Sequence, residues 1–223
     1  MSIYYKIELF LNLLKYSIRE KFFKIEDNHI LFLQEYFKEK TKGLYIDVGC
    51  YHPIRLSTTK FLHDKGWMGI NIDISKKSID LFKITRKKDI NLNIGIGNKN
   101  KISEAYFKKS LFHANTLDYE HSEKFLGKST KRKIAVRTLQ SVINEYVEGK
   151  MIDLIDIDCE GKDQDVLQGL DFSKNKIDLI SIEMHAYDEN IKKKGELIFD
   201  IMERNKFKKI YGNYPATLIF KKF

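Results

Sequence analysis

The sequence is poor in cysteine and proline, with 2 of each among 223 residues. Cys50 and Cys159 lie in apolar segments without CxxC or Cys/His spacing, which argues against a disulfide framework and a zinc site. No apolar run reaches the roughly 18 residues that cross a bilayer, and the N-terminus lacks the residue order of a signal peptide. We therefore expect a cytoplasmic protein, with peripheral attachment to the inner face of the membrane as an alternative.

The low numbers of glycine and proline, 12 and 2, also argue against linkers and low-complexity segments. The hydrophobic fraction of 43% suffices for one core, so we expect a domain at residues 43–223 behind an N-terminal helical cap at 1–42. The net charge of +9 comes from Lys spread along the chain, so a nucleic-acid partner is not expected. The sequence assigns no oligomeric state.

The N-terminal segment predicts a basic amphipathic helix at residues 3–24 and a second helix at 28–40. The first helix either contacts a membrane surface or packs its apolar face on the domain, where it would cover a substrate pocket. We favour packing, because Glu8, Glu20 and Glu26 interrupt its basic character.

From residue 44 onward, short apolar runs alternate with helical patterns, which is typical of βα units and a parallel sheet. Strands are expected at residues 44–48, 68–73, 90–96, 151–157, 177–183, 207–211 and 216–220. Helices are expected at residues 57–65, 76–87, 164–170 and 192–205. The pattern predicts a doubly wound α/β fold whose mostly parallel seven-stranded sheet ends in an antiparallel hairpin.

Residues 99–133 have poor periodicity, and we interpret them as a substrate-side insertion. His113, Asn115, Thr116, Tyr119 and His121 cluster there among many charges. A solvated surface excursion is the alternative.

The first predicted strand ends in an acidic residue and a glycine, at a place where open sheets bind nucleotide-like ligands. Gly49 would let the backbone approach a cofactor, and Asp47 could hold a cationic amino group. Tyr51 and Pro53 replace the later glycines of a dinucleotide fingerprint. Ser57 or Thr58 would cap the next helix.

The second predicted strand ends at Asp73, 24 residues beyond Gly49. A carboxylate at this distance accepts hydrogen bonds from ribose hydroxyls, which favours an adenosine-containing cofactor. We add Ile74, Gly95 and Ile96 to the expected cofactor site, with the backbone after the third strand reading the adenine edge.

The fourth predicted strand ends in a dense group of acidic residues that includes Asp156, Asp158 and Glu160. Such groups repel one another unless a cation, a sulfonium or hydrogen-bond donors lie nearby. We expect Asp158 to contact the cofactor and, with Glu160, to line the junction between cofactor and acceptor; Asp163 could cap the next helix instead.

The fifth predicted strand brings Glu183 and His185 to the same edge of the sheet. His185 or Glu160 is the candidate general base, which gives the catalytic set Asp158, Glu160 and His185. A variant of this hypothesis adds Mg²⁺ or Mn²⁺, held by Asp158, Glu183 and His185.

Taken together, these motifs resemble the FkbM family of methyltransferases over about residues 43–222. The resemblance rests on Asp47-Val48-Gly49 with Pro53, Gly66-Trp67, Asp73, residues 136–139, Ile157-Asp158-Cys159-Glu160-Gly161, residues 166–169 and Ile182-Glu183. It implies a Rossmann-like methyltransferase fold and transfer of a methyl group from S-adenosylmethionine to a hydroxyl. In this family the acceptor is commonly a sugar of a polysaccharide, a glycolipid or a natural product. Cys159 and Asp156 depart from the usual family residues.

Several alternatives stay open at this point. The acceptor could be RNA or another small molecule, and an RNA acceptor predicts salt-dependent binding. An NAD-dependent oxidoreductase shares Gly49 and Asp73, although the incomplete glycine fingerprint and the terminal hairpin count against it. A non-catalytic membrane-associated nucleotide-binding module would use the N-terminal helix as its anchor.

Overall fold

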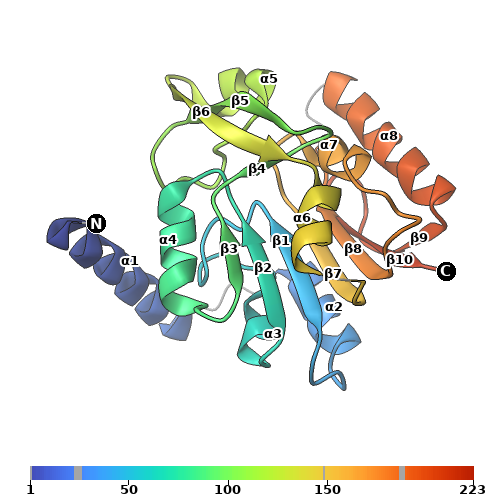
Figure 1. Ribbon diagram of the computed structural model, residues 1–223, viewed down its shortest axis with the longest axis horizontal. Helices are drawn as coiled ribbons and strands as arrows, with labels where there is room; N and C mark the ends of the chain where they lie inside the picture. The colour runs from blue at the N-terminus through green and yellow to red at the C-terminus, as the bar shows by residue number, and fades with distance from the viewer. Residues whose placement is uncertain (1, 23–26, 148, 186–188) are drawn as a thin grey trace.

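The computed structural model describes residues 2–22, 27–147, 149–185 and 189–223. Its centre is a seven-stranded sheet in the order β3-β2-β1-β7-β8-β10-β9 (Figure 1). The strands are β1 Leu44–Val48, β2 Met68–Ile72, β3 Ile90–Leu92, β7 Ile152–Ile157, β8 Ile177–Glu183, β9 Phe207–Tyr211 and β10 Thr217–Lys222. The first five strands in spatial order are parallel, and β10 is antiparallel to both of its neighbours. The predicted doubly wound fold with a terminal hairpin is confirmed.

The central strands are buried on both faces, as expected for a parallel sheet covered by helices. In β1, Ile46 and Val48 join a cluster with α6 Leu139–Tyr146, α7 Asp163–Gln168 and α8 Glu189–Arg204. Tyr45 points to the other face. There it packs in a cluster with α2 Asn28–Tyr36 and α3 Lys60–Asp64. Period-2 alternation therefore divides the core into two layers.

The predicted third strand, residues 90–96, is wrong as one element. Its first part is β3, whereas β4 Gly95–Ile96 belongs to a second sheet of order β4-β6-β5. The break lies at Asn93, whose side-chain amide donates to the backbone oxygens of Asp73 and Ile74. These bonds turn the chain away from the edge of β2.

The insertion contains regular structure that the sequence pattern missed. It holds β5 Lys101–Phe107, α5 Tyr119–His121, a π-helix at Ser122–Leu126 and the start of β6 Thr130–Arg137. Most residues of β5 and β6 are exposed, and the buried ones lie near one end of each strand. These strands therefore lack the alternation of apolar and polar residues that would have indicated them. The second sheet lies beyond the carboxyl ends of β1 and β2 (Figure 1).

Helix boundaries also differ from those predicted. The helix expected at 57–65 is shortened to α3, and its N-cap is Thr59 rather than Ser57 or Thr58. The helix α7 begins at Asp163 after an N-cap at Lys162, so Asp163 is not the cap. The helix α4 spans Lys76–Thr85 and is capped by Ser75, while α6 was not predicted.

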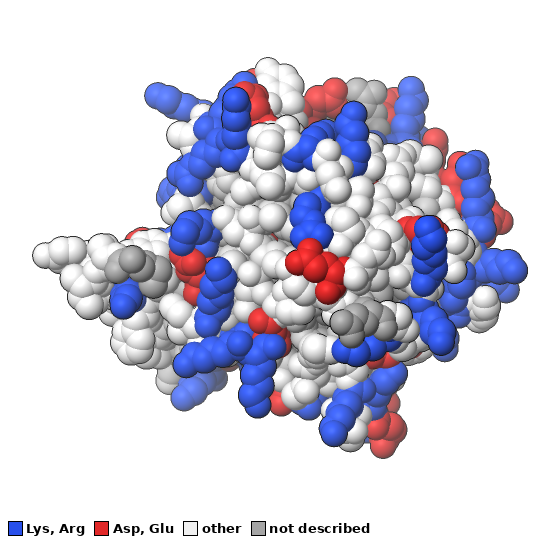
Figure 2. All heavy atoms as spheres, in the orientation of Figure 1, with Lys and Arg blue, Asp and Glu red and all other residues white. Residues whose placement is uncertain are grey.

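The N-terminal helix α1 Ile3–Phe22 packs beside α4 through Leu9 and Leu13, which contact Leu81 (Figure 1). Residues 23 and 24 of the predicted helix, and Glu26, lie outside the described residues. Lys and Arg side chains are spread among Asp and Glu over the face in Figure 2. Across the described part of the chain, no helix combines the length and apolar character that a membrane span requires.

Candidate functional site

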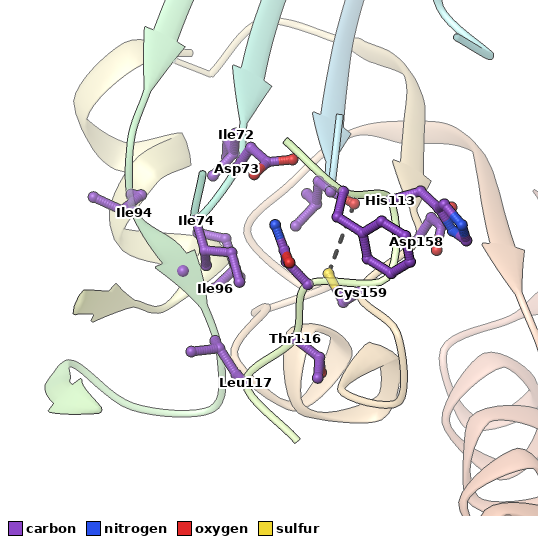
Figure 3. Close-up of a pocket in the computed structure, with 15 residues that line it drawn as sticks. Ile72, Asp73, Ile74, Ile94, Ile96, His113, Thr116, Leu117, Asp158 and Cys159 are labelled. Atoms are coloured by element: carbon purple, nitrogen blue, oxygen red, sulfur yellow. Dashed lines mark hydrogen bonds between the residues drawn. The ribbon is translucent and has the colours of Figure 1, made fainter. Parts of the chain in front are cut away.

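A hollow lies at the carboxyl ends of β1 and β2 and extends to β4 (Figure 3). We call it the first hollow. Apolar side chains from Ile74, Ile94, Ile96 and Leu117 form one side, and His113 and Asp158 lie together on the other. Among the residues expected to bind the cofactor, six line it: Gly49, Asp73, Ile74, Gly95, Ile96 and Asp158.

Gly49 makes a turn that no larger residue could make without rearrangement. Its φ is +92°, and its amide donates to the oxygen of Ile72 at 2.9 Å. A Cβ at this position would lie 1.8 Å from the backbone oxygen of Asp158. The turn after β1 therefore lies directly against the end of β7, which leaves backbone rather than side chain at the hollow.

Asp73 connects two backbone segments that border the hollow. Its carboxylate accepts a hydrogen bond from the Tyr51 amide at 2.8 Å and another from the Ser75 amide at 2.6 Å. Burial raises the pKa of Asp73 to about 6 despite these two bonds. A carboxylate has about four lone-pair sites, so acceptor capacity is left for ligand hydroxyls.

A second hollow, of about 140 Å³, adjoins the first and has an acidic lining. The two share Gly49, His113 and Asp158. Its other lining residues are Asp47, Cys50, Tyr51, Leu56, Ser57, Thr58, Asp156, Glu160 and Glu183. A ligand in the first hollow and a ligand in the second would therefore approach each other beside His113 and Asp158.

Glu160 is surrounded by imidazoles. Its carboxylate lies 2.9 Å from Nε2 of His121, 3.8 Å from Nδ1 of His113 and 3.7 Å from Nε2 of His185. Burial opposes ionisation, but hydrogen bonds with His113 and His121 and the charge of His185 outweigh it and lower the pKa to about 2. Glu160 also has a left-handed φ of +52°, which is strained for a residue with a side chain.

Asp158 has the opposite electrostatic environment. Burial, followed by the charges of Glu183 and Glu160, raises its pKa well above the ordinary value. The site thus contains two acids of contrasting character, with Glu160 ionised at neutral pH and Asp158 favouring its proton.

Asp47 and Asp156 are register partners on β1 and β7, and both are buried. Asp47 accepts a hydrogen bond from the Thr59 hydroxyl at 2.6 Å. Burial and the neighbouring Asp156 raise the pKa of Asp47 to about 7. Asp47 thus borders the second hollow and does not line the first.

Other predicted residues lie at varying distances from the first hollow. Tyr51 and Ser57 line the second hollow but not the first. Pro53 lines neither, and its carbonyl accepts from Arg86 at 3.0 Å. His185 borders a separate hollow with Lys194.

A third hollow, of about 350 Å³, separates α1 from the loop before α3. It shares Leu56 and Ser57 with the second hollow. Its remaining lining is mixed: Tyr16, Arg19, Glu20, Asp27, Ile30, Gln34, Ile54, Arg55, Lys60, Phe61 and Asp64. The second hollow therefore lies next to both the first and the third.

His113 borders both of the first two hollows, although no sequence pattern distinguishes it from the other polar residues of the insertion. The insertion is held over the site by polar contacts: the Thr116 hydroxyl donates to the backbone oxygen of Glu160 at 2.8 Å, and Lys194 donates to the Asp118 carboxylate at 2.7 Å. The polar cluster of the insertion was the available sequence signal for this part of the site. Because Glu160 lies far from that cluster in the sequence, the contacts of Glu160 with its histidines could not be predicted.

Among the described residues, Glu160, Glu183 and His185 offer ligand atoms within 4.8 Å of one another. This group contains two of the three residues predicted to bind a metal, with Glu160 in place of Asp158.

Comparisons with known proteins identify the family of this chain. The family model described as "Methyltransferase FkbM domain" matches residues 47–209. A crystal structure of a "putative rRNA-methylase" from Clostridium thermocellum has a TM-score of 0.48 at 11% identity, over 89% of this chain and 100% of that one. A search of curated proteins gives no match. Since the family model matches most of the chain, including the turn after β1 and the acidic end of β7, this protein belongs to the FkbM family of methyltransferases.

Proposed function

We propose that this protein is an S-adenosylmethionine-dependent O-methyltransferase that acts on a sugar hydroxyl of a surface polysaccharide, a glycolipid or a nucleotide-linked precursor. The observation that carries the proposal is the lining shared by the first two hollows, which consists of Gly49, His113 and Asp158. A methyltransferase has to bring a donor and an acceptor together at one point, and this junction provides such a point.

The first hollow has the chemical features that an adenosine-containing cofactor requires. Asp73 offers a carboxylate for ribose hydroxyls, while Ile74 and Ile96 offer apolar surfaces for a base. Gly49 exposes backbone at the turn. Bound S-adenosylmethionine would supply an electrophilic methyl group on a positively charged sulfur, and the carboxylates of the adjoining hollow favour such a charge.

The second and third hollows provide room for the acceptor. The third has a volume of about 350 Å³, within the range of roughly 300–1,000 Å³ that is usual for ligand sites. It combines aromatic rings, Tyr16 and Phe61, with the cationic donors Arg19 and Lys60. The aromatic rings offer apolar surface to a sugar, while Glu20, Asp27 and Asp64 balance the cations of this lining.

We assign the general base to His113, because its imidazole borders both hollows. Glu160 is the residue that positions it, at 3.8 Å from Nδ1. With its pKa near 2, Glu160 is itself a weak base at neutral pH. His185, which with Glu160 was one of the two bases expected from the sequence, lies 3.7 Å from Glu160 and remains the alternative.

Calorimetric titration with S-adenosylmethionine, S-adenosylhomocysteine and NAD tests the cofactor. Micromolar binding of the first two, with none for NAD, supports the proposal; preference for NAD overturns it. Transfer of isotope-labelled methyl groups to nucleotide-linked hexoses, oligosaccharides and, separately, RNA then tests the acceptor. Labelled sugar supports the assignment, whereas label only in RNA contradicts it.

Metal dependence is a variant that this geometry keeps open. Glu160, Glu183 and His185 could bind Mg²⁺ or Mn²⁺ together with a sugar diol. Loss of activity in a chelator, with recovery on adding one metal, would support it. Full activity in the chelator would exclude it.

A further inference from the structure

The N-terminal helix α1 leaves most of its apolar side chains in solvent. Only Leu9 and Leu13 are buried in this helix, all of whose residues the structure describes. The exposed large apolar residues are Ile3, Tyr4, Ile7, Phe10, Leu11, Leu14, Ile18 and Phe22, with exposed fractions from 45% to 82%. The packing favoured by the sequence therefore accounts for only a small part of the apolar surface of α1.

These exposed residues form one continuous stripe. At 3.6 residues per turn, Ile7, Leu11, Leu14 and Ile18 follow one another along a single face. Leu9 and Leu13 lie on the opposite face, where they contact α4. The stripe thus faces away from the domain, and Figure 2 shows the α1 end as a mostly white projection.

Polar contacts fix α1 in this orientation. The Tyr5 hydroxyl donates to Asp80 at 3.0 Å, and the His52 ring lies 2.9 Å from the Asn12 side chain. Glu8 forms an ion pair with Lys77. Because these contacts all lie opposite or beside the stripe, the helix cannot bury the stripe on the domain by turning without breaking them.

The charges of α1 indicate what covers the stripe. Lys6, Lys15, Arg19 and Lys21 outnumber Glu8 and Glu20, and each of these acids pairs with a lysine of the domain. An apolar stripe with cationic borders matches an anionic lipid surface, where the stripe enters the acyl boundary and the cations meet headgroups. A second copy of α1 would bring the same cations together, which is unfavourable.

We propose that α1 binds an anionic membrane surface through this outward stripe. The proposal does not depend on the identity of the methyl acceptor. It makes α1 an interfacial helix that lies on one leaflet.

Co-sedimentation of the intact chain with vesicles tests this surface. We expect binding to phosphatidylcholine vesicles that contain phosphatidylglycerol, weaker binding at high salt, and little binding to phosphatidylcholine alone. Leu11→Gln together with Ile18→Gln should weaken the partition by about a hundredfold, since each buried aliphatic side chain contributes roughly tenfold. Gln is a good helix former, so α1 itself should persist.

The matched control replaces Ile102 and Phe223 by Gln, two residues exposed at 66% and 62% outside α1. It should bind vesicles like the native chain. An unchanged affinity for S-adenosylhomocysteine, or unchanged near-ultraviolet circular dichroism, confirms folding of each variant. Equal binding by both variants, or no vesicle binding at all, overturns the proposal. A concentration-dependent dimer that Leu11→Gln and Ile18→Gln abolish, without vesicle binding, assigns the stripe to a second copy and also overturns it.

Discussion

The Glu160 carboxylate lies 2.9 Å from Nε2 of His121, and the same carboxylate lies within 3.8 Å of His113. One acid thus connects two histidines of the insertion to the end of β7. The insertion is therefore part of the candidate site. In the proposed mechanism Glu160 holds the imidazole of His113 in place, and that imidazole takes the proton.

His113→Gln should lower kcat by about 10²-fold or more, with a small change in KM for the methyl donor, because general-base catalysis contributes roughly 10²–10⁴-fold. Glu160→Gln should give a similar loss through a misplaced His113. His185→Gln serves as the comparison in steady-state kinetics. If it reduces kcat more than His113→Gln does, the base is His185, one of the two expected from the sequence.

Asp73→Asn should weaken S-adenosylhomocysteine binding at least about tenfold, because hydrogen bonds to a charged acceptor contribute roughly 1.5–3 kcal/mol. The ionised form is the better acceptor, so affinity of the native protein should fall as pH drops through its pKa of about 6. Titration calorimetry between roughly pH 5 and 8, where most proteins are near their maximal stability, measures both effects.

The exposed carboxylate of Asp200 provides a control on α8. Asp200→Asn should bind with native affinity and native pH dependence. A pH dependence that survives in Asp73→Asn would exclude Asp73 as its source.

Gly49→Ala should prevent stable folding or cofactor binding, since its Cβ would lie 1.8 Å from the Asp158 oxygen. Gly66→Ala is matched, because Gly66 also has a positive φ, of +83°, but a Cβ there meets nothing within 4 Å. That control should lose only about 1–2 kcal/mol for the left-handed backbone. Thermal unfolding of both variants compares them, and equal losses would contradict the close approach of the two strand ends.

Asp47→Asn should change how stability depends on pH. In the native chain the pKa of Asp47 is raised to about 7 by burial and by Asp156, from the 3.8 of a solvated group. The folded state therefore retains a proton that the unfolded state loses, so stability falls as pH rises between these values.

The amide that replaces the carboxyl group in this variant cannot ionise, and the fall should shrink by an amount on the order of 4 kcal/mol. Urea unfolding at a series of pH values tests this expectation. A steeper fall in the variant than in the native chain would show that the charged Asp47 is stabilised instead.

Cofactor binding should displace the segment at residues 112–117. The first hollow has a volume of about 40 Å³, well below the roughly 300 Å³ of a small ligand site. The Leu117 side chain lies close to Gly95, at 2.7 Å from the position of a Cβ there. Hydrogen exchange of peptides covering 112–117 should change on adding S-adenosylhomocysteine, while those covering β9 should not. Unchanged exchange with bound ligand would place the cofactor elsewhere.

Much of the fold could be predicted because strands such as β1 and β7 are short, buried throughout and followed by helices. The same logic placed Gly49 and Asp73 at one edge of the sheet, where both line the first hollow. The insertion could not be predicted in this way. Its strands are largely exposed and lack alternation, and contacts such as His121 with Glu160 join residues that no local pattern connects.

The side chain of Asn93 produced the error in the third strand. Its two hydrogen bonds to the carbonyls of Asp73 and Ile74 end β3, although the surrounding apolar residues fit a longer strand. Periodicity detects which face is buried, but it does not detect a polar side chain that redirects the backbone.

The arrangement of the three hollows bears on regioselectivity. Under the proposed function, an acceptor whose body occupied the space beside Tyr16 would extend toward His113 past Leu56 and Ser57, which line both the third and the second hollow. The hydroxyl that becomes methylated would then be selected by its reach from the bound body of the molecule. For a glycan acceptor of the proposed kind, inserting one sugar between carrier and target would then move methylation along the glycan rather than abolish it.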